Sequence, residues 1–458
     1  MKLKINRSHR MTHSQAPTPR GHFLLGNLMA LRRDLFATFT RWQQEYGDIV
    51  RFRVGWEIGH LLCHPEMAHE VLIQRQSAFG KVSLNGQVSG LQLVLGNGLL
   101  ISDGEFWRRQ RRMMQPSFHR SQIAAMADKI TAAGERLLAR WATYCPHEPI
   151  DIADEMMDLT LDVISQSMFS SNVMLQFEHL ESSLSMLQRF VFEDSLNPWR
   201  LPFSWPPRRH KRALKTVDDA IYAVIEERRA SRKRYDDLLD MLLQVRDKQT
   251  GQGMSDQEIR DEISTIFAAG HDTIAQALTW SWYLLALHPT VQQRMRAELS
   301  QVLGGRTPTV ADLPNLSYTK QVLEESMRLY PPTPFLFRFV MQDSTMNGFH
   351  LPASSHLILS IYHIHRHPDF WPEPEMFDPD RFTPANQQQR HRSTYMPFGG
   401  GRRLCIGQHF ALMEGQLLLA MIAQKYELRL VPGHALQLEM TTTLQPRNGL
   451  KMTWHRLA

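Results

Sequence analysis

Cysteine is scarce in this chain. The 458 residues include three cysteines, Cys63, Cys145 and Cys405. Three separated cysteines give no even disulfide framework, and they cannot form the thiolate cluster of an iron–sulfur domain. Because unpaired cysteines are typical of compartments that keep thiols reduced, we expect the protein to be cytoplasmic.

Long apolar runs and flexible linkers are also missing. Residues 1–20 are polar and basic, with no apolar segment as long as that of a signal peptide or a membrane span. They are expected to form an extension without a membrane anchor. No Gly/Ser-rich linker, repeat or low-complexity tract divides the remainder of the chain, so residues 21–458 are predicted to form one domain.

Charge of one sign is only slightly in excess. The chain has 52 Lys and Arg against 46 Asp and Glu, which gives a formal net charge of +6. The two signs are interspersed and no nucleic-acid-binding motif occurs, so binding of nucleic acid is excluded as a function. The small basic surplus is compatible with an acidic protein partner.

One cysteine lies in an informative setting. Cys405 follows the turn Gly399-Gly400-Gly401 and Arg403, and it precedes a helix predicted at residues 408–425. A nearby cation and a helix N-terminus both favour a thiolate, so we expect the pKa of Cys405 to be lowered. The glycines would let the backbone approach a flat ligand closely. This setting indicates a thiolate held against a metal; for the cysteine taken alone, a buried structural role is the alternative.

The residues around Cys405 match a known signature. Phe398, Gly401, Arg403, Cys405 and Gly407 have the types and spacing of the haem-binding motif of the cytochrome P450 family, which the chain resembles along essentially its whole length. The resemblance implies haem b as the cofactor, with Cys405 as the axial ligand of its iron. It also implies that Phe398, Gly401, Arg403 and Gly407 bind the cofactor.

A second pattern joins one acid to two arginines. Glu325 and Arg328 are three residues apart, which places them on one helix face, and Arg381 occurs further along in the segment Phe377-Asp378-Pro379-Asp380-Arg381-Phe382. Taken singly, such residues are most often a solvated ion pair. In the family that the chain resembles, they form a buried structural triad that holds the cysteine loop.

A third motif lies within a long apolar helix predicted from Ser255 to Ala286. A glycine in the middle of a helix costs about 1 kcal/mol against alanine, so Gly270 suggests a close approach or a bend. By the resemblance, the oxygen-activation site comprises Ala269, Gly270, Asp272 and Thr273. Gly270 would leave room for oxygen, Thr273 would offer a hydroxyl, and Asp272 would relay protons from solvent. The alternative is an Asp-Thr pair on a solvent-exposed face.

The carboxylates of a haem need cationic partners. By the resemblance, Trp107 and Arg111 supply such partners from an arginine-rich helix. Arg338, after Pro331-Pro332, and Arg403, beside the cysteine, would complete the set. Arg108, Arg109 and Arg112 would remain outside and steer an acidic redox partner. A merely solvated basic surface is the alternative.

The coarse pattern predicts a mainly α fold with a small β-rich lobe. Strands are expected as a hairpin at 48–54 and 57–63, after the prolines near 331, and at 444–452. Helical periodicity predicts further helices at 122–141, 152–169, 214–232, 236–245, 291–303 and 320–329. This order resembles the cytochrome P450 fold, with a long central helix over the haem and the cysteine loop beneath it.

The resemblance implies a haem-thiolate monooxygenase that inserts one oxygen atom from O2 into an apolar substrate, such as a fatty acid, a terpenoid or a polyketide-like molecule. Because the chain has no flavin or iron–sulfur domain, electrons would come from NAD(P)H through a ferredoxin or flavodoxin-type donor and its reductase. The alternatives are a peroxide-using haem-thiolate enzyme and a non-catalytic haem sensor or carrier.

Apolar residues near these motifs are expected to line the substrate pocket. They are Val82, Leu84, Val88, Leu91, Leu93, Val94, Phe267, Ala268, Phe335 and Leu336. The segment 197–212 mixes aromatic residues, prolines and bases. It is predicted to be a mobile lid, with contact to a membrane surface as the alternative.

Overall fold

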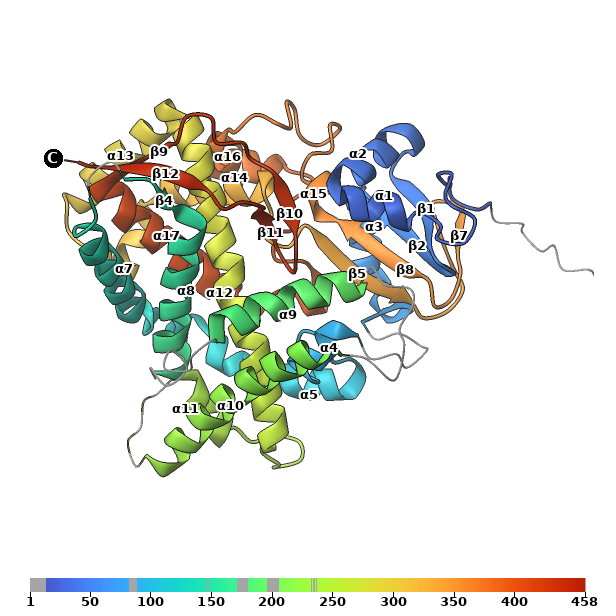
Figure 1. Ribbon diagram of the computed structural model, residues 1–458, viewed down its shortest axis with the longest axis horizontal. Helices are drawn as coiled ribbons and strands as arrows, with labels where there is room; N and C mark the ends of the chain where they lie inside the picture. The colour runs from blue at the N-terminus through green and yellow to red at the C-terminus, as the bar shows by residue number, and fades with distance from the viewer. Residues whose placement is uncertain are drawn as a thin grey trace, which may run out of the picture.

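In the computed structural model, the protein is mainly helical and carries a small β-rich lobe, as predicted (Figure 1). The structure describes residues 14–81, 89–145, 148–170, 180–195, 206–231, 233, 235 and 237–457. The predicted pocket residues Val82, Leu84 and Val88, and most of the segment 197–212, lie outside the described residues.

The α-helices of the described part are α1 (Leu28–Arg33), α2 (Leu35–Tyr46), α3 (Pro65–His69), α4 (Gly90–Leu95), α5 (Gly104–Met114), α6 (Arg120–Ala124), α7 (Ala127–Trp141), α8 (Ile152–Phe169), α9 (Leu180–Ser195), α10 (Arg208–Ala230), α11 (Leu238–Gln244), α12 (Asp256–Leu287), α13 (Pro289–Leu303), α14 (Ser317–Leu329), α15 (Ile361–Ile364), α16 (Pro384–Gln389) and α17 (Gln408–Lys425). Short turns of other helix types are η1 (Glu70–Gln74), η2 (Gln76–Ala78), η3 (Gln115–Phe118), η5 (Val310–Asn315), η6 (Pro379–Phe382) and η7 (Gly401–Arg403).

The strands are β1 (Ile49–Val54), β2 (Glu57–Leu62), β3 (Phe79–Gly80), β4 (Ile150–Asp151), β5 (Phe335–Val340), β6 (Ser344–Met346), β7 (Phe349–Leu351), β8 (His356–Ser360), β9 (Tyr426–Leu430), β10 (Leu438–Met440), β11 (Leu444–Pro446) and β12 (Lys451–Arg456). Among the described residues, no helix is long and apolar enough to cross a membrane.

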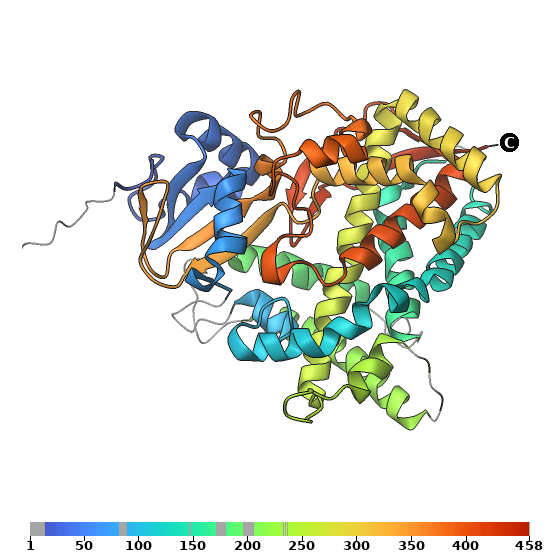
Figure 2. The same ribbon diagram turned by 180° about the vertical axis from the view of Figure 1, so that it is seen from behind.

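Helix α12 passes through the middle of the molecule, where it packs against α8 and α17 (Figure 1, Figure 2). It begins with a capping box: the Ser255 hydroxyl accepts the Glu258 N–H, and the Glu258 carboxylate accepts the Ser255 N–H. Side chains on every face of α12 are buried in the main core. A helix that is buried all round is a rigid support for a functional group.

The five strands of the N-terminal lobe have the order β1-β2-β8-β5-β3. The predicted hairpin is present, since Ile49 pairs with Leu62 and Val54 pairs with Glu57. Its tight turn contains Gly55, which takes a positive φ of 60°. Residues 14–20 lie against this lobe. Ala16 is buried there, and the Pro17 carbonyl accepts the Arg51 N–H.

The C-terminal strands belong to two small sheets. β12 pairs with β9 and β4, whereas β10 pairs only with β11. The strand region predicted at 444–452 is therefore divided between these sheets. The turn between β10 and β11 reaches α12, where the Thr443 hydroxyl donates to the Asp272 carboxylate.

Most predicted helices are present, with different accuracy at their ends. α8 and α17 have the predicted bounds, and α12 is displaced by one residue at each end. The predicted helix 122–141 is divided into α6 and α7 by a break at Ala125–Met126, and α10 begins earlier than predicted, at Arg208. α9 was not predicted.

Candidate active site

The loop before α17 leaves the side chain of Cys405 accessible. The Cys405 N–H donates to the Phe398 carbonyl over 3.0 Å, and the Leu404 N–H donates to the Gly401 carbonyl over 3.1 Å. These bonds close the loop, so that Cys405 lies just before the first residue of α17 and is exposed. The N–H groups of Gly407 and Gln408 donate to its sulfur. A helix N-terminus thus faces the thiol, as the sequence predicted.

The predicted effect on the thiol is nevertheless wrong. Although the Cys405 side chain is accessible, the protein packed around it desolvates the sulfur and raises the pKa of Cys405, which outweighs the lowering by the Gly407 N–H, Arg111 and the Gln408 N–H. Arg403 was expected to stabilise the thiolate, but its guanidinium donates to Asp103 over 2.7 Å and to the Ser102 carbonyl over 2.8 Å. A metal that coordinates the sulfur would hold it as a thiolate, because a coordinating thiol is deprotonated by its metal.

The glycines of the loop serve different contacts. Gly401 has a φ of 66°, and a Cβ added there would lie 1.9 Å from the Leu72 carbonyl oxygen in η1. Gly407 has an ordinary φ of −84°, and an added Cβ would meet only the Cys405 sulfur, at 3.9 Å. Gly401 is therefore required by the backbone of η1, whereas Gly407 leaves space next to the sulfur.

The substitution Gly401→Ala should displace the cysteine loop. A positive φ costs an L-residue about 1–2 kcal/mol, and a backbone oxygen cannot move aside as a side chain can, so the free energy of unfolding should fall by at least about 2 kcal/mol. Denaturant unfolding of the holoprotein measures this loss. Gly407→Ala is the matched control and should cost less than about 1 kcal/mol. Equal losses in the two variants would contradict the assigned role of Gly401.

The middle of α12 has one accessible stretch. Between Ile259 and Trp282, every residue is buried except Ala268, Ala269, Gly270 and Thr273. The Thr273 hydroxyl donates to the Ala269 carbonyl over 2.7 Å. A helix that is otherwise buried all round presents small side chains and one hydroxyl here, which is the surface expected above a bound flat ligand.

Gly270 belongs to a helix crossing. A Cβ added at Gly270 would lie 2.5 Å from Cδ1 of Ile164 in α8. A side chain at this position would therefore point at α8, and the glycine lets α8 pack closely on α12. The close approach predicted at Gly270 is therefore present, and it is made to α8.

Asp272 is the least exposed member of the motif. It is 1% exposed, and its carboxylate accepts hydrogen bonds from Thr442, Thr443, Gln188 and Gln276. Asp272 was predicted to relay protons from solvent, and its burial means that it does not contact solvent directly. Any proton that reaches Asp272 from water must pass through groups that surround it.

Three cations gather beside the cysteine loop against one acid. The cations are Lys81, Arg338 and Arg403, and the acid is Asp103. Burial lowers the pKa of Lys81 well below its usual value and that of Arg338 to about 10, and in each case Arg403 adds to the lowering. Buried cations in excess of acids are costly unless anionic groups join them. The cluster is therefore suited to a ligand with carboxylates.

Lys81 was not predicted as a site residue. Its backbone N–H donates to Asp103 over 2.7 Å, which fixes it beside Arg403. Trp107 completes the group, since the Arg403 guanidinium lies 4.4 Å from its ring centroid. A single lysine after Phe79-Gly80 carries no spacing signal, so only the folded chain identifies it.

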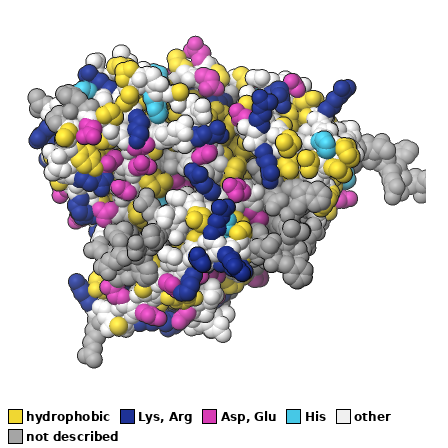
Figure 3. All heavy atoms as spheres, in the orientation of Figure 1, with side chains coloured by type: hydrophobic (Ala, Val, Ile, Leu, Met, Phe, Trp, Pro, Cys, Tyr) yellow, Lys and Arg dark blue, Asp and Glu magenta, His cyan; other side chains and the backbone are white. Residues whose placement is uncertain are grey.

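The arginines of helix α5 have two kinds of partner. Arg111 is half-buried and close enough to Cys405 for the two charges to interact. Arg109 and Arg112, which were predicted to lie outside and steer a redox partner, are paired with acids: Arg109 donates to Glu258 over 2.6 Å and Arg112 to Asp247 over 2.9 Å. They therefore attach α5 to the start of α12 and to the turn before it. Charges of both signs are interspersed over the face seen in Figure 3.

The structure brings Glu325, Arg328 and Arg381 together. Arg328 donates twice to the Glu325 carboxylate, over 2.6 and 2.8 Å, and Arg381 Nε lies 3.5 Å from it. The side chains of Glu325 and Arg328 are both fully buried. Arg328 also donates to the carbonyls of His365, Pro374 and Met376, so the pair ties α14 to the segment that leads to the cysteine loop.

Three predicted pocket walls, Phe335, Phe267 and Val94, belong to the core instead. Phe335 is 2% exposed and stacks on Phe36 with ring centroids 5.4 Å apart. Phe267 is 1% exposed and packs against His271. By contrast, Leu91, Leu93, Ala268 and Leu336 keep part of their surface accessible, whereas Val94 is buried.

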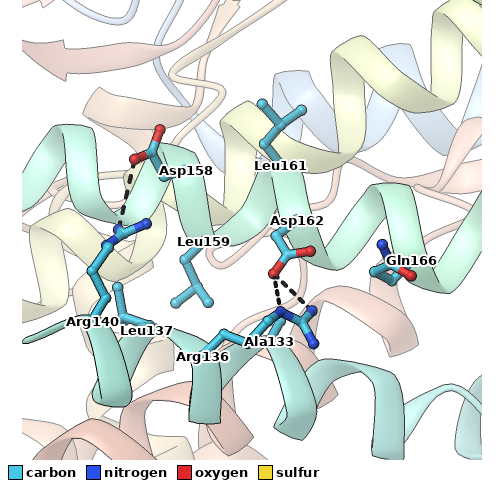
Figure 4. A pocket seen from close by; sticks show the side chains of 9 residues that line it. All are labelled: Ala133, Arg136, Leu137, Arg140, Asp158, Leu159, Leu161, Asp162 and Gln166. Carbon is cyan, nitrogen blue, oxygen red and sulfur yellow. Dashed lines mark hydrogen bonds and ion pairs between the residues drawn. The ribbon is translucent and has the colours of Figure 1, made fainter. Parts of the chain in front are cut away.

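A surface hollow between α7 and α8 is a poor candidate for the active site (Figure 4). Arg136 is paired with Asp162 over 2.7 Å, and Arg140 is paired with Asp158 over 3.6 Å. Both arginines of the hollow are thus neutralised within the protein. The exposed cysteine and the unmatched cations lie elsewhere, at the cysteine loop.

These observations define the class of protein. An accessible cysteine at a helix N-terminus, small residues along the central helix, and cations suited to two carboxylates fit a haem held by a thiolate. Residues 16–454 match the family model for cytochrome P450.

Similar proteins agree with this class. Cyclooctatin synthase of Streptomyces melanosporofaciens is 35% identical over 415 residues, which cover 89% of this chain and 87% of that protein. Cyclooctat-9-en-7-ol 5-monooxygenase of the same organism is 35% identical over 418 residues, covering 90% and 89%. Among solved structures, the heme domain of cytochrome P450DA is 25% identical and superposes with a TM-score of 0.88, covering 97% of this chain and 98% of that one.

The chain therefore belongs to the cytochrome P450 family and is a monooxygenase of that family. Its fold is the predicted one. Membership implies a haem with a thiolate ligand, an apolar substrate and electrons from redox partners.

Proposed function

We propose that this monooxygenase binds haem b through Cys405 and hydroxylates an apolar, terpenoid-type substrate, with electrons from an acidic carrier protein. One observation carries the proposal: the accessible Cys405 sulfur receives two backbone N–H groups at the start of a buried helix. Bound haem supplies an iron that activates O2, and an axial thiolate favours cleavage of the O–O bond.

The residues of the site would divide the remaining tasks. Phe398, Gly401 and Gly407 shape the cysteine loop, and the triad of Glu325, Arg328 and Arg381 holds the segment before it. The two carboxylates of the haem would be held by buried or half-buried groups, namely Trp107, Arg111, Arg338, Arg403 and Lys81.

Ala269, Thr273 and Asp272 would serve the reaction from α12. Ala269 presents a small side chain, and the Thr273 hydroxyl can turn from the Ala269 carbonyl to present a proton. Asp272, which is buried, would return a proton to the Thr273 hydroxyl. Burial of the surrounding residues excludes stray water from the reacting atoms.

The substrate class is supported by two observations. The accessible residues near the site, Leu91, Leu93, Ala268 and Leu336, are apolar and uncharged. The relative that oxidises cyclooctat-9-en-7-ol acts on an unsaturated carbon skeleton with a single hydroxyl, as its name states. A molecule of this kind needs burial of apolar surface and no ionic partner.

The carrier would dock on the cysteine side. A hollow there is lined by Trp107, Gly401 and Leu404 and by four arginines, Arg108, Arg111, Arg112 and Arg402. Arg108 is paired with Glu105 and Arg112 with Asp247, so Arg111 and Arg402 supply most of its positive charge. Such a surface steers a negatively charged protein, as a ferredoxin or flavodoxin is expected to be.

We expect cyclic terpenoid alcohols to displace water from the ferric haem, which a spectral titration detects, and to bind at least about 10-fold more tightly than fatty acids of equal carbon number. Reconstitution with a ferredoxin and its reductase should give a product that contains one atom of isotopically labelled O2. The rate of electron transfer should fall as salt is added. Product formed with hydrogen peroxide but not with the carrier would contradict the proposal.

A further inference from the structure

Four uncharged donors converge on the Asp272 carboxylate. Thr443 donates to Oδ2 over 2.9 Å, and Thr442 donates to the same oxygen over 3.3 Å. Gln188 of α9 also donates to Oδ2, over 3.3 Å, and Gln276 donates to Oδ1 over 3.4 Å. Because Asp272 is 1% exposed, a charge on it depends on these donors.

The turn that carries the two threonines is anchored to α12 by a separate contact. Trp280 of α12 donates from Nε1 to the Leu444 carbonyl over 2.9 Å, and the Leu444 N–H donates to the Pro332 carbonyl over 3.0 Å. Trp280 lies about two helical turns after Asp272. One helix thus holds both the acid and the turn that serves it, so the threonine hydroxyls keep their place against the carboxylate.

The two hydroxyls differ in their access to water. Thr443 is 3% exposed and makes the shorter bond to Asp272. Thr442 is half-buried and makes the longer one. Thr443 is therefore suited to hold the carboxylate in place, and Thr442 to exchange protons with water.

We propose that Thr443 is a positioning residue for Asp272, and that Thr442 passes protons from water to it. This inference deepens the proposed function and rests on it, since it requires Asp272 to donate protons during turnover. In each transfer, the Thr442 hydroxyl gives its proton to Oδ2 and takes another from water, so the threonine ends unchanged. The proton held by Asp272 moves on to the Thr273 side of the helix.

Valine substitutions test the two hydroxyls, because valine keeps the branched shape of threonine. In reconstituted turnover, Thr443→Val should lower the product formed per NADPH about 10-fold and raise peroxide release, since a misplaced general acid loses most of its effect. Thr442→Val should increase the solvent isotope effect about 2-fold, because proton transfer becomes slower than the other steps. Thermal unfolding of each holoprotein checks that the fold is intact.

Thr441 provides a matched control on the same turn. Its hydroxyl is buried and has no hydrogen-bond partner among the described residues. Thr441→Val should therefore leave the coupling and the isotope effect unchanged. In the Asp272→Asn background, Thr443→Val should not lower the product formed per NADPH any further, because the two residues act as one unit.

A readout without turnover separates positioning from general damage. The infrared carboxyl band that Asp272→Asn removes from the ferric protein should shift in Thr443→Val and stay in place in Thr441→Val. If Thr443→Val resembles the parent protein in band and coupling while Asp272→Asn uncouples turnover, the inference is overturned and the proposed function stands. If Asp272→Asn itself leaves coupling unchanged, the proposed role of Asp272 fails, and the inference fails with it.

Discussion

Cys405→Ser should remove the thiolate spectrum and lower product formation at least about 100-fold. Loss of a group that merely orients a metal ligand lowers metal affinity or activity about 10–100-fold, so loss of the ligand itself should lower activity at least as much. A serine hydroxyl is a harder donor that ionises far less readily than a thiol, and the N–H groups of Gly407 and Gln408 would then face a neutral oxygen. The measurement is the spectrum of the reduced protein under carbon monoxide, in which thiolate ligation shifts the Soret band strongly to the red.

Cys145→Ser is the control for this substitution. Cys145 is also an exposed free cysteine, but it lies after α7 and outside the cysteine loop. Its replacement should leave the spectrum and the turnover intact. A red-shifted band that survives in Cys405→Ser would assign the ligand to another residue and would remove the basis of the proposed site.

Arg328→Leu should lower the free energy of unfolding by about 3–5 kcal/mol, because it leaves the Glu325 carboxylate buried without its main partner. Three carbonyls, those of His365, Pro374 and Met376, would also lose a donor. Since a typical domain is stable by about 5–15 kcal/mol, we expect poor yield and loss of haem. Urea unfolding of the holoprotein gives the size of the effect.

Two further arginine variants make this prediction decisive. Arg294 pairs with Asp380 at the surface, and Arg294→Leu should cost about 0–1 kcal/mol. Arg381→Leu should fall between the two, since Arg381 reaches Glu325 through one contact of 3.5 Å. If Arg328→Leu unfolds at the same urea concentration as Arg294→Leu, the pair on α14 does not hold the cysteine loop.

Features that depend on neighbours in the chain could be predicted from the sequence. The ends of α8 and α17 follow from periodic apolar residues with a cap or a turn beside them. The Glu325–Arg328 pair follows from a spacing of three on one helix, and the position of Cys405 at a helix N-terminus follows from the glycine turn before it. In each case, the relevant contact lies within one element.

Contacts between distant segments could not be predicted. Arg403 lies two residues from Cys405, so local reasoning assigned its charge to the sulfur; in the folded chain it bonds Asp103, 300 positions away. The same limit explains Arg109, which was expected to steer a redox partner and is paired with Glu258. Lys81 became recognisable only as the third cation in a cluster built from separate segments. The pairing of such groups is decided by which surfaces the fold brings together.

The turn that serves Asp272 comes late in the chain. Thr442 and Thr443 come 170 and 171 positions after Asp272. During synthesis, α12 leaves the ribosome long before these residues exist, so its acid first lacks two of its four donors. A buried carboxylate without partners is unfavourable, and this opposes early closure of the core around α12. A hairpin near the C-terminal end of the sequence therefore completes the surroundings of the acid in the middle of the chain.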